Sequence, residues 1–160
     1  MSKSPITSPL GDAEREATGA VLQATLVDLV DLSLIAKQAH WNVVGPNFRS
    51  AHLQLDELVD AARGYVDDVA ERANAIGISP NGKAKVVVKS SGIPEYPDNW
   101  QSVESTVSAI VDILGELIKR LRKRIDETDK SDLVTQDLLI EITQELEKQH
   151  WMWQAQTAKA

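Results

Sequence analysis

The chain has 160 residues, of which 42% are hydrophobic and 26% are charged, and its formal net charge is −7 at pH 7. This length and balance predict one globular domain with a substantial core. The absence of cysteine excludes disulfides and thiolate metal sites, so carboxylate and imidazole remain as the strong metal ligands. The acidic charge argues against a body that binds nucleic acid by general electrostatics, and it suits a protein that handles cations.

Neither a membrane span nor a secretory leader is expected. No apolar run approaches the roughly 18 residues that a span needs, and the beginning of the chain, MSKSPITSPLGD, lacks the apolar middle of a signal peptide. The expected location is therefore the cytoplasm, with association with the nucleoid if DNA is bound.

The first part of the chain is expected to be a flexible tail over residues 1–11, which is rich in Ser, Pro and Gly. Apolar residues at helical spacing then predict a helix that is capped by Asp12 and is stopped by the Gly-Pro-Asn sequence at 45–47. A second helix is expected over 48–76, because Gly77 occupies the position that a helix C-cap prefers.

A long connection over 77–98 follows, with at most one short segment near the sequence KAKVVVK. A capping box that opens at Asp98 predicts the start of a third helix, which extends to about residue 126. The fourth helix is expected over 133–158. Four long helices with one long middle connection predict an all-α fold over 12–158, a four-helix bundle of the ferritin-like kind with a long crossover that contains a short helix.

The expected second helix carries four potential metal ligands as two pairs at i, i+4 spacing, His52 with Asp56 and Asp67 with Glu71. At about 100° per residue, all four fall within an arc of about 100°, so they form one stripe. Asp56 and Asp67 nevertheless lie eleven residues apart, which is roughly 16 Å along a helix. Carboxylates bind hard cations at about 2 to 2.6 Å, so the two pairs cannot close on one ion within a single chain.

A two-fold dimer would supply the missing half of the site. If the helix packs antiparallel against its own copy and crosses it near Ala61 and Ala62, the first pair of one chain lies opposite the second pair of the other. Two equivalent sites per dimer would follow. His40 lies six residues before Pro46 and His52 lies six after it, so an antiparallel hairpin places both imidazoles at a similar height, roughly 9 Å from the turn. His40 is therefore expected to join the first pair.

These residues resemble the signature of Dps proteins, the DNA-protection proteins of starved cells, which are also called miniferritins. The family pattern is Lys-x-x-His-Trp-Asn, a Gly turn with a following Phe, then His-x-x-x-Asp and Asp-x-x-x-Glu-Arg. In this chain the pattern falls on Lys37, His40, Trp41, Asn42, Gly45, Phe48, His52, Asp56, Asp67, Glu71 and Arg72. The order and lengths of the four helices match as well, so the resemblance covers nearly the whole chain.

The resemblance implies a hollow homo-dodecamer built from two-fold dimers, with ferroxidase sites at the dimer axes. It implies that His40, His52 and Asp56 of one subunit and Asp67 and Glu71 of another bind iron as a dinuclear centre. The implied substrates are ferrous iron and hydrogen peroxide as the preferred oxidant. Ferric mineral would be stored in the cavity, which would protect the cell from oxidative damage. Ligand type alone also allows zinc or manganese as competitors.

Residues beside the expected ligands are candidates for supporting roles. Lys37, Asn42 and Arg72 are expected to orient the ligands and to set their protonation. Trp41 has two interpretations: a redox-active neighbour that intercepts stray oxidants, or a large ring that packs at the interface.

Acidic residues before and within the fourth helix are candidate pore residues. In the family, acids in this region line the three-fold channels that admit ferrous ions, which makes Asp137 the leading candidate and Asp129 and Asp132 further ones. Ordinary surface acids are the alternative. Glu147 and His150 form a single Glu-x-x-His unit, of which larger di-iron bundles carry two. The resemblance does not use this unit, so both are interpreted as structural or surface residues.

Binding of DNA is expected to be weak or absent. Family members that condense DNA often use a mobile, Lys-rich tail, whereas this chain has only Lys3 near one end and Lys159 near the other. Five basic residues within 119–124 are interpreted as a solvated or inter-subunit face, with a nucleic-acid patch as the alternative. The competing hypothesis for the function is a DNA-compacting structural shell with incidental metal binding.

Overall fold

The computed structural model describes residues 4–158, which form four long helices, one short helix and two short strands. The long helices are α1 (Asp12–Asn42), α2 (Phe48–Ala75), α4 (Val103–Thr128) and α5 (Leu133–Ala155). The short helix α3 (Ala84–Ser90) lies in the connection between α2 and α4. Strands β1 (Val43–Val44) and β2 (Gln101–Ser102) pair in parallel.

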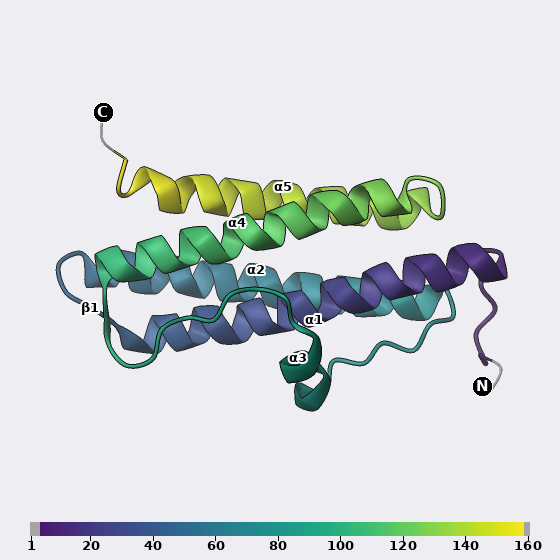
Figure 1. Cartoon of the computed structure of the whole chain (residues 1–160), viewed down its shortest axis with the longest axis horizontal. Helices are drawn as coiled ribbons and strands as arrows, with labels where there is room; N and C mark the ends of the chain where they lie inside the picture. Colours follow the sequence, from purple (N-terminus) through teal and green to yellow (C-terminus); the bar gives the residue numbers. More distant parts are fainter. Residues whose placement is uncertain (1–3, 159–160) are drawn as a thin grey trace.

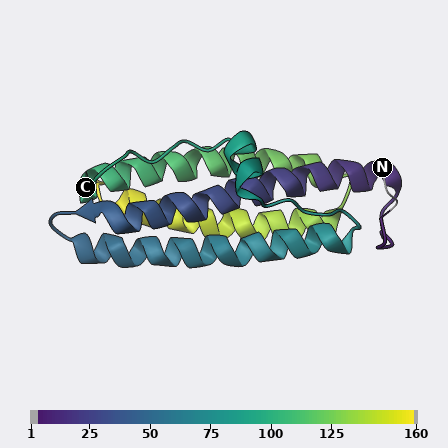
Figure 2. The ribbon, with the colours of Figure 1, turned by 90° about the horizontal axis from the view of Figure 1, so that it is seen from below.

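Two helical hairpins, α1 with α2 and α4 with α5, lie side by side along the length of the molecule (Figure 1). The connection from α2 to α4 carries α3 against α1 and runs along the outside of the bundle (Figure 2). It ends where β2 pairs with β1, beside the turn between α1 and α2. The predicted all-α, ferritin-like four-helix bundle with a long crossover that contains a short helix is therefore confirmed.

Aliphatic side chains at helical spacing form the core. Leu22 and Leu29 of α1, together with Leu114, Leu117 and Leu121 of α4, are fully buried. Burying one such side chain stabilises the fold by about 1.5–3 kcal/mol. A core of this kind holds the long helices as a rigid frame for the polar residues described below.

The helix α1 is apolar enough to pass a test for a membrane span, because one of its windows has a mean hydropathy of 1.6. The expectation that no uninterrupted apolar run reaches the necessary length still holds, because Asp28 and Asp31 lie within this helix. In the structure, 61% of that window is buried within the bundle. A helix that packs in the middle of a core is apolar for this reason, so its burial accounts for the pattern.

The start of α4 differs from the prediction. The helix begins at Val103, and its N-cap is Ser102, whose hydroxyl accepts a 3.1 Å hydrogen bond from a backbone N–H of the first turn. The predicted cap, Asp98, lies before β2, where pairing of Gln101 with Val43 keeps the backbone extended. Pairing with a distant strand therefore delays the helix.

The end of α2 is a Schellman-type cap. Gly77 has a φ of 78°, its N–H donates to the carbonyl of Asn74 at 2.9 Å, and the N–H of Ile78 donates to the carbonyl of Ala73 at 2.9 Å. A side chain at Gly77 would also approach the backbone oxygen of Ile6 at 3.0 Å. Glycine is needed here for both reasons, and the predicted end of the helix is correct.

The residues before α1 contact the bundle. Gly11 is the N-cap of α1, so Asp12 is its first helical residue rather than its cap. Leu10 packs against the core. The division into a tail over 1–11 and a bundle over 12–158 stays a prediction, and the two tail lysines, Lys3 and Lys159, lie outside the described residues.

A buried carboxylate fixes the crossover to the bundle. Asp28 of α1 is fully buried, and its Oδ2 accepts from Arg120 at 2.9 Å and from Arg124 at 2.6 Å. Its Oδ1 accepts from the backbone N–H of Gly92 at 3.1 Å. A Cβ at Gly92 would come within 2.5 Å of the Arg120 guanidinium, so the missing side chain lets the crossover pass this close.

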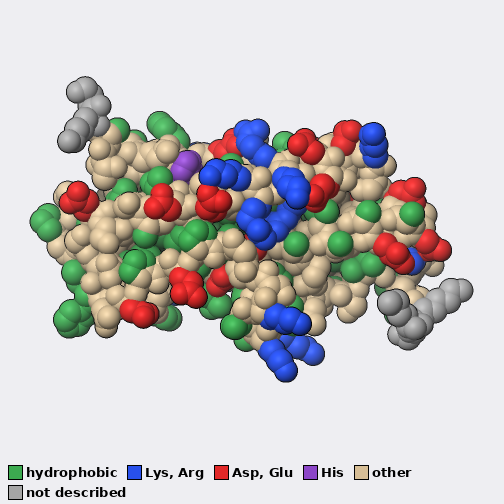
Figure 3. Space-filling view, in the orientation of Figure 1, with side chains coloured by type: hydrophobic (Ala, Val, Ile, Leu, Met, Phe, Trp, Pro, Cys, Tyr) green, Lys and Arg blue, Asp and Glu red, His purple; other side chains and the backbone are tan. Residues whose placement is uncertain are grey.

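The rest of the basic run on α4 lies on the surface. Figure 3 shows Lys and Arg side chains gathered over the middle of α4 and over α3. Three of them pair with nearby glutamates: Lys119 with Glu116, Arg122 with Glu147, and Lys123 with Glu127. The run is therefore largely neutralised by the chain's own carboxylates, and Glu147 takes part in this surface pairing.

We expect Asp28→Ala to lower the free energy of unfolding by about 3–5 kcal/mol, because it leaves two arginines without their buried partner. Urea unfolding measures the change. Arg122→Ala is the matched control: it removes an exposed pair of the same run and should cost only about 0–1 kcal/mol. Equal losses in the two variants would contradict the anchoring role of Asp28.

Candidate metal centre

Two histidines face each other across the hairpin of α1 and α2. The ring centroids of His40 and His52 are 3.6 Å apart, and the rings are stacked with an interplanar angle of 23°. The Nδ1 atom of each lies 2.9 Å from the backbone carbonyl oxygen of the other. A carbonyl only accepts hydrogen bonds, so each Nδ1 carries a proton and Nε2 is the ring nitrogen left to bind a metal ion. Two imidazoles oriented in this way are suitable metal ligands.

The turn between α1 and α2 positions both rings. Gly45 and Asn47 have φ values of 109° and 62°, in the left-handed region, and the N–H of Phe48 donates to the carbonyl of Gly45 at 3.1 Å. The Phe48 ring then lies 5.0 Å from the His52 imidazole. The tight turn thus brings residues on either side of it level with each other.

Asp56 lies one helical turn after His52 and extends this cluster. Its Oδ1 accepts a 2.5 Å hydrogen bond from Lys37 Nζ and lies 3.2 Å from His40 Nδ1. The hydrogen bond from Lys37 lowers the pKa of Asp56 below its ordinary value, and desolvation only partly opposes this effect. The carboxylate is therefore ionised at neutral pH, with Lys37 as its counter-charge.

Asp67 and Glu71 lie further along α2 with exposed side chains. Within residues 4–158, no group of three or more His, Asp or Glu side chains converges closely enough to hold a metal ion. The cluster of His40, His52 and Asp56 and the second pair thus remain separate in a single chain.

The predicted crossing level at Ala61 and Ala62 stays a prediction, but Ala62 itself cannot make the contact. It is fully buried in the core of its own chain. The residues beside it with exposed side chains are Asp60 and Arg63, followed by Gly64. The middle of the outward surface of α2 is therefore charged, not a patch of small apolar residues.

Arg72, which was expected beside the ligands, turns toward α5. It forms an ion pair with Asp132 at 2.5 Å and donates from Nε to the Thr135 hydroxyl at 3.0 Å. Asp132 is also the N-cap of α5 and accepts from the N–H of Val134 at 3.2 Å. Arg72 therefore ties the end of α2, next to Glu71, to the start of α5.

The three candidate pore acids have different surroundings. Burial raises the pKa of Asp132, but the hydrogen bonds from Arg72 and Thr135 outweigh it, so the net pKa is lowered. Its side chain is only 5% exposed, and its carboxylate is committed to the fold, unlike the exposed Asp129 and Asp137.

Asp137 and Glu71 line the same groove, which lies between α2 and α5 and has a volume of about 680 Å³. Asp68 and Glu141 also line this groove. Asp68 was not among the predicted site residues. It lies three residues before Glu71, and this spacing places both side chains on one side of a helix.

Trp41 is 66% exposed and lines a second groove, of about 530 Å³, between α1 and the crossover. Leu34 and Tyr96 line the same groove. Both interpretations of Trp41, as a redox-active neighbour and as a packing residue, remain open in this position.

Comparisons with known proteins agree with this architecture. A family model for the ferritin-like domain matches residues 19–160. The chain is 37% identical over 151 residues to the DNA protection during starvation protein of Mycolicibacterium smegmatis, a match that covers 94% of this chain and 82% of the relative. It is 30% identical to the protein of the same name from Agrobacterium fabrum, with 84% of each chain covered.

Solved structures show the same relationship. The Mycobacterium smegmatis Dps structure matches with a TM-score of 0.94 and 36% identity over 100% of this chain and 91% of that one. DpsA14 from Streptomyces coelicolor matches with a TM-score of 0.93 and 31% identity over 99% and 95%. The chain belongs to the ferritin-like family. Within that family it is one of the Dps proteins.

We expect Asp132→Ala to lower the free energy of unfolding by about 3–5 kcal/mol at neutral pH, because Arg72 then loses its buried partner. The folded-state pKa of Asp132 lies below its unfolded value of about 3.9, so its contribution is complete above that pH and is lost as the pH falls through the folded-state pKa. Urea unfolding over a pH series should show a constant difference from the native chain near neutrality that narrows in acid.

The exposed Asp129→Ala variant is the control for that experiment and should unfold like the native chain. A difference between native chain and Asp132→Ala that stays the same down to pH 2 would contradict the ionised pair.

Proposed function

We propose that this protein is a ferroxidase and an iron store. It oxidises Fe(II), preferentially with hydrogen peroxide, at dinuclear sites shared between subunits, and it stores ferric iron in a dodecameric shell that protects the cell from oxidative damage. The observation that carries the proposal is that the His40 and His52 rings stack 3.6 Å apart and that Asp56 Oδ1 lies 3.2 Å from His40 Nδ1, at one end of the ligand stripe on α2. Asp67 and Glu71, at the other end, are the ligands that a partner subunit would receive.

The proposed ligands suit both oxidation states of the substrate. Imidazole binds ferrous iron well, and carboxylates stabilise the harder ferric product. Two ferrous ions supply the two electrons that reduce one hydrogen peroxide molecule, with two protons, to two water molecules. Because both electrons arrive together, no hydroxyl radical is released.

The hydrogen bonds around the cluster prepare it for iron. Each Nδ1–H bond to a backbone carbonyl fixes the ring orientation of His40 or His52 and makes its Nε2 a better ligand. Lys37 keeps Asp56 ionised and balances its charge. Zinc and manganese remain competitors for the same ligands, and competition with ferrous iron followed by the oxidation rate distinguishes them.

The groove between α2 and α5 supports a route for incoming ferrous ions. Asp137 is our leading pore residue, because it is exposed and shares this groove with the proposed ligand Glu71. Asp129 is a second exposed candidate. Asp132 is the weakest of the three, because its carboxylate already pairs with Arg72.

DNA binding is proposed to be weak or absent, and the location to be cytoplasmic. The net charge is −7, and the basic run on α4 is paired with carboxylates. The alternative function is a DNA-compacting shell, which the charges of this chain do not favour; the names of the relatives state DNA protection and not compaction.

We expect the double variant His52→Ala with Asp56→Ala to lose stoichiometric binding of ferrous iron and to slow peroxide-driven oxidation by at least about tenfold. Anaerobic calorimetry measures the binding, and stopped-flow absorbance of ferric product measures the rate. Glu57→Ala is the control, because Glu57 is exposed on the same helix and is not a proposed ligand.

Native mass spectrometry should give a mass near twelve subunits, and an active monomer would contradict the shared site.

For DNA, we expect no retarded complex in a gel shift at about 0.15 M salt, because a chain with a net charge of −7 repels the phosphates. The series is repeated at lower salt, with and without residues 1–11. A complex that persists at physiological salt would favour the DNA-compacting alternative, and its loss with the tail would place the contact there.

A further inference from the structure

The centre of the ligand stripe on α2 carries two opposite charges. Asp60 and Arg63 lie between the two ligand pairs, and at about 100° per residue they fall inside the same arc of about 100°. Both side chains are exposed. Their i, i+3 spacing would allow a local ion pair, but neither forms one with any residue in the described part of the chain.

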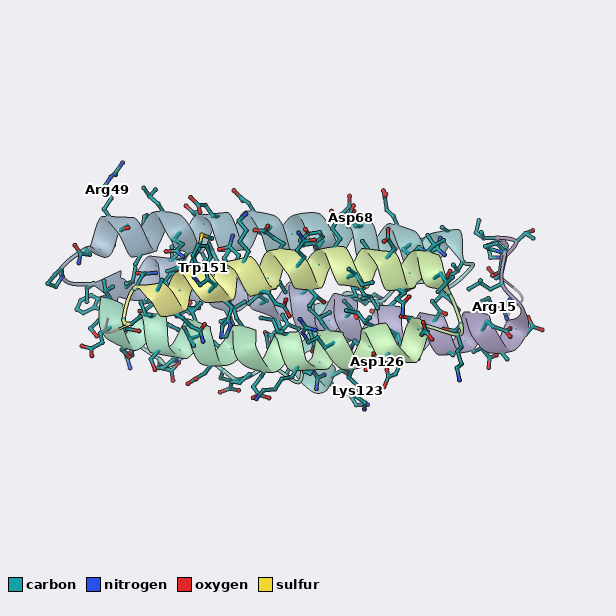
Figure 4. The ribbon with its side chains drawn as sticks, turned by 90° about the horizontal axis from the view of Figure 1, so that it is seen from above. Arg15, Arg49, Asp68, Lys123, Asp126 and Trp151 are labelled. Atoms are coloured by element: carbon teal, nitrogen blue, oxygen red, sulfur yellow. The ribbon has the colours of Figure 1, made fainter. Side chains whose placement is uncertain are left out.

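This side of α2 faces away from the bundle. Arg49 lies on the same stripe, and Figure 4 shows it extending outward on the side of α2 that no other helix covers. A Cβ placed on Gly64, at the edge of the stripe, would meet no atom within 4 Å. The surface is therefore open to a second helix along its length.

The antiparallel register that completes the metal centre also pairs these two charges. His52 faces Glu71 and Asp56 faces Asp67 when the numbers of facing residues add to 123. Asp60 and Arg63 meet the same condition. In a two-fold dimer, Asp60 of each copy therefore lies opposite Arg63 of the other.

We infer that an Asp60–Arg63 ion pair, formed twice across the two-fold axis with a second copy of this chain, sets the register in which the two halves of the metal centre meet. The inference rests on the proposed function. Each residue lies about 2 Å along the helix from the axis, so the pair stays in contact over a wide range of helix crossing angles. The ligands lie further out and depend on that register.

Shifted registers are disfavoured by the same two residues. A slip of three residues in one direction places Asp60 opposite Asp60 of the other copy, and a slip of three in the other direction places Arg63 opposite Arg63. Like charges in direct opposition are destabilising, so the pair both favours the correct register and opposes its neighbours.

The charge of the whole stripe strengthens this argument. Asp60, Asp67 and Glu71 are carboxylates that no ion pair balances within the described residues. They outnumber the two arginines of the stripe, Arg49 and Arg63, so two such surfaces repel each other weakly. Pairing of Asp60 with Arg63 neutralises the centre of the contact. The acidic ends of the contact are then left for cations.

A charge swap tests the inference. Asp60→Arg and Arg63→Asp are made singly and together, and assembly is measured by native mass spectrometry without iron. In each single variant, residues 60 and 63 of opposite copies carry the same charge, and the two-fold axis repeats this contact. We therefore expect at least a tenfold loss of the assembled form. The double variant restores opposite charges and should recover assembly, and ferrous binding measured by anaerobic calorimetry should follow assembly in all three.

Glu57→Arg is the matched control. It reverses an exposed charge on the same helix, but the residue opposite it in the expected register is the uncharged Val66, so assembly should be unchanged. Circular dichroism checks that each variant keeps its helices, as expected for changes at exposed positions.

Two results would overturn the inference: single variants that assemble like the native chain, or a double variant that fails to recover. Failure of the proposed function gives a different result, because a native chain that does not oxidise iron can still assemble and respond to the swap. Recovery by the double variant alone therefore supports the ion pair independently of iron chemistry.

Discussion

The fixed rise of an α-helix is the constraint on which the proposed metal centre depends. Asp56 and Asp67 lie on the same side of α2, but they are roughly 16 Å apart, a distance that no pair of side chains bridges. Packing fixes this helix against the bundle, because Leu55, Leu58 and Val69 on its inner side are buried in the core. One half of the proposed ligand set therefore lies at the α1–α2 hairpin, and the proposal assigns the other half to the site of a different chain.

The carboxylates of this acidic protein divide into two groups. Asp28 and Asp132 are buried, and arginines from other helices neutralise them, so they hold the crossover and the start of α5 in place. Asp60, Asp67 and Glu71 are exposed along α2, and none forms an ion pair within the described residues. Folding is thus separated from the chemistry of the surface, where the proposed function assigns metal ions or a second copy as the source of positive charge.

Features that depend on neighbouring residues were predictable from the sequence. The end of α2 at Gly77 and the short helix near KAKVVVK follow from glycine geometry and local propensity. The start of α4 was not predictable in this way. Asp98 is a residue type that commonly caps helices. However, Gln101 pairs with Val43, which is far away in the sequence, and this pairing moves the start of the helix to Val103.

Residue order was enough to place the histidines at equal distances from the turn and the ligands of α2 on one stripe, because helical geometry is local and regular. It could not distinguish Asp132 from Asp129 and Asp137, or Ala62 from its exposed neighbour Asp60. The first difference results from the ion pair between Arg72 of α2 and Asp132. The second results from burial of one side of α2 against the bundle. Periodicity determines which residues share a side of a helix, whereas packing between distant segments determines which side is covered.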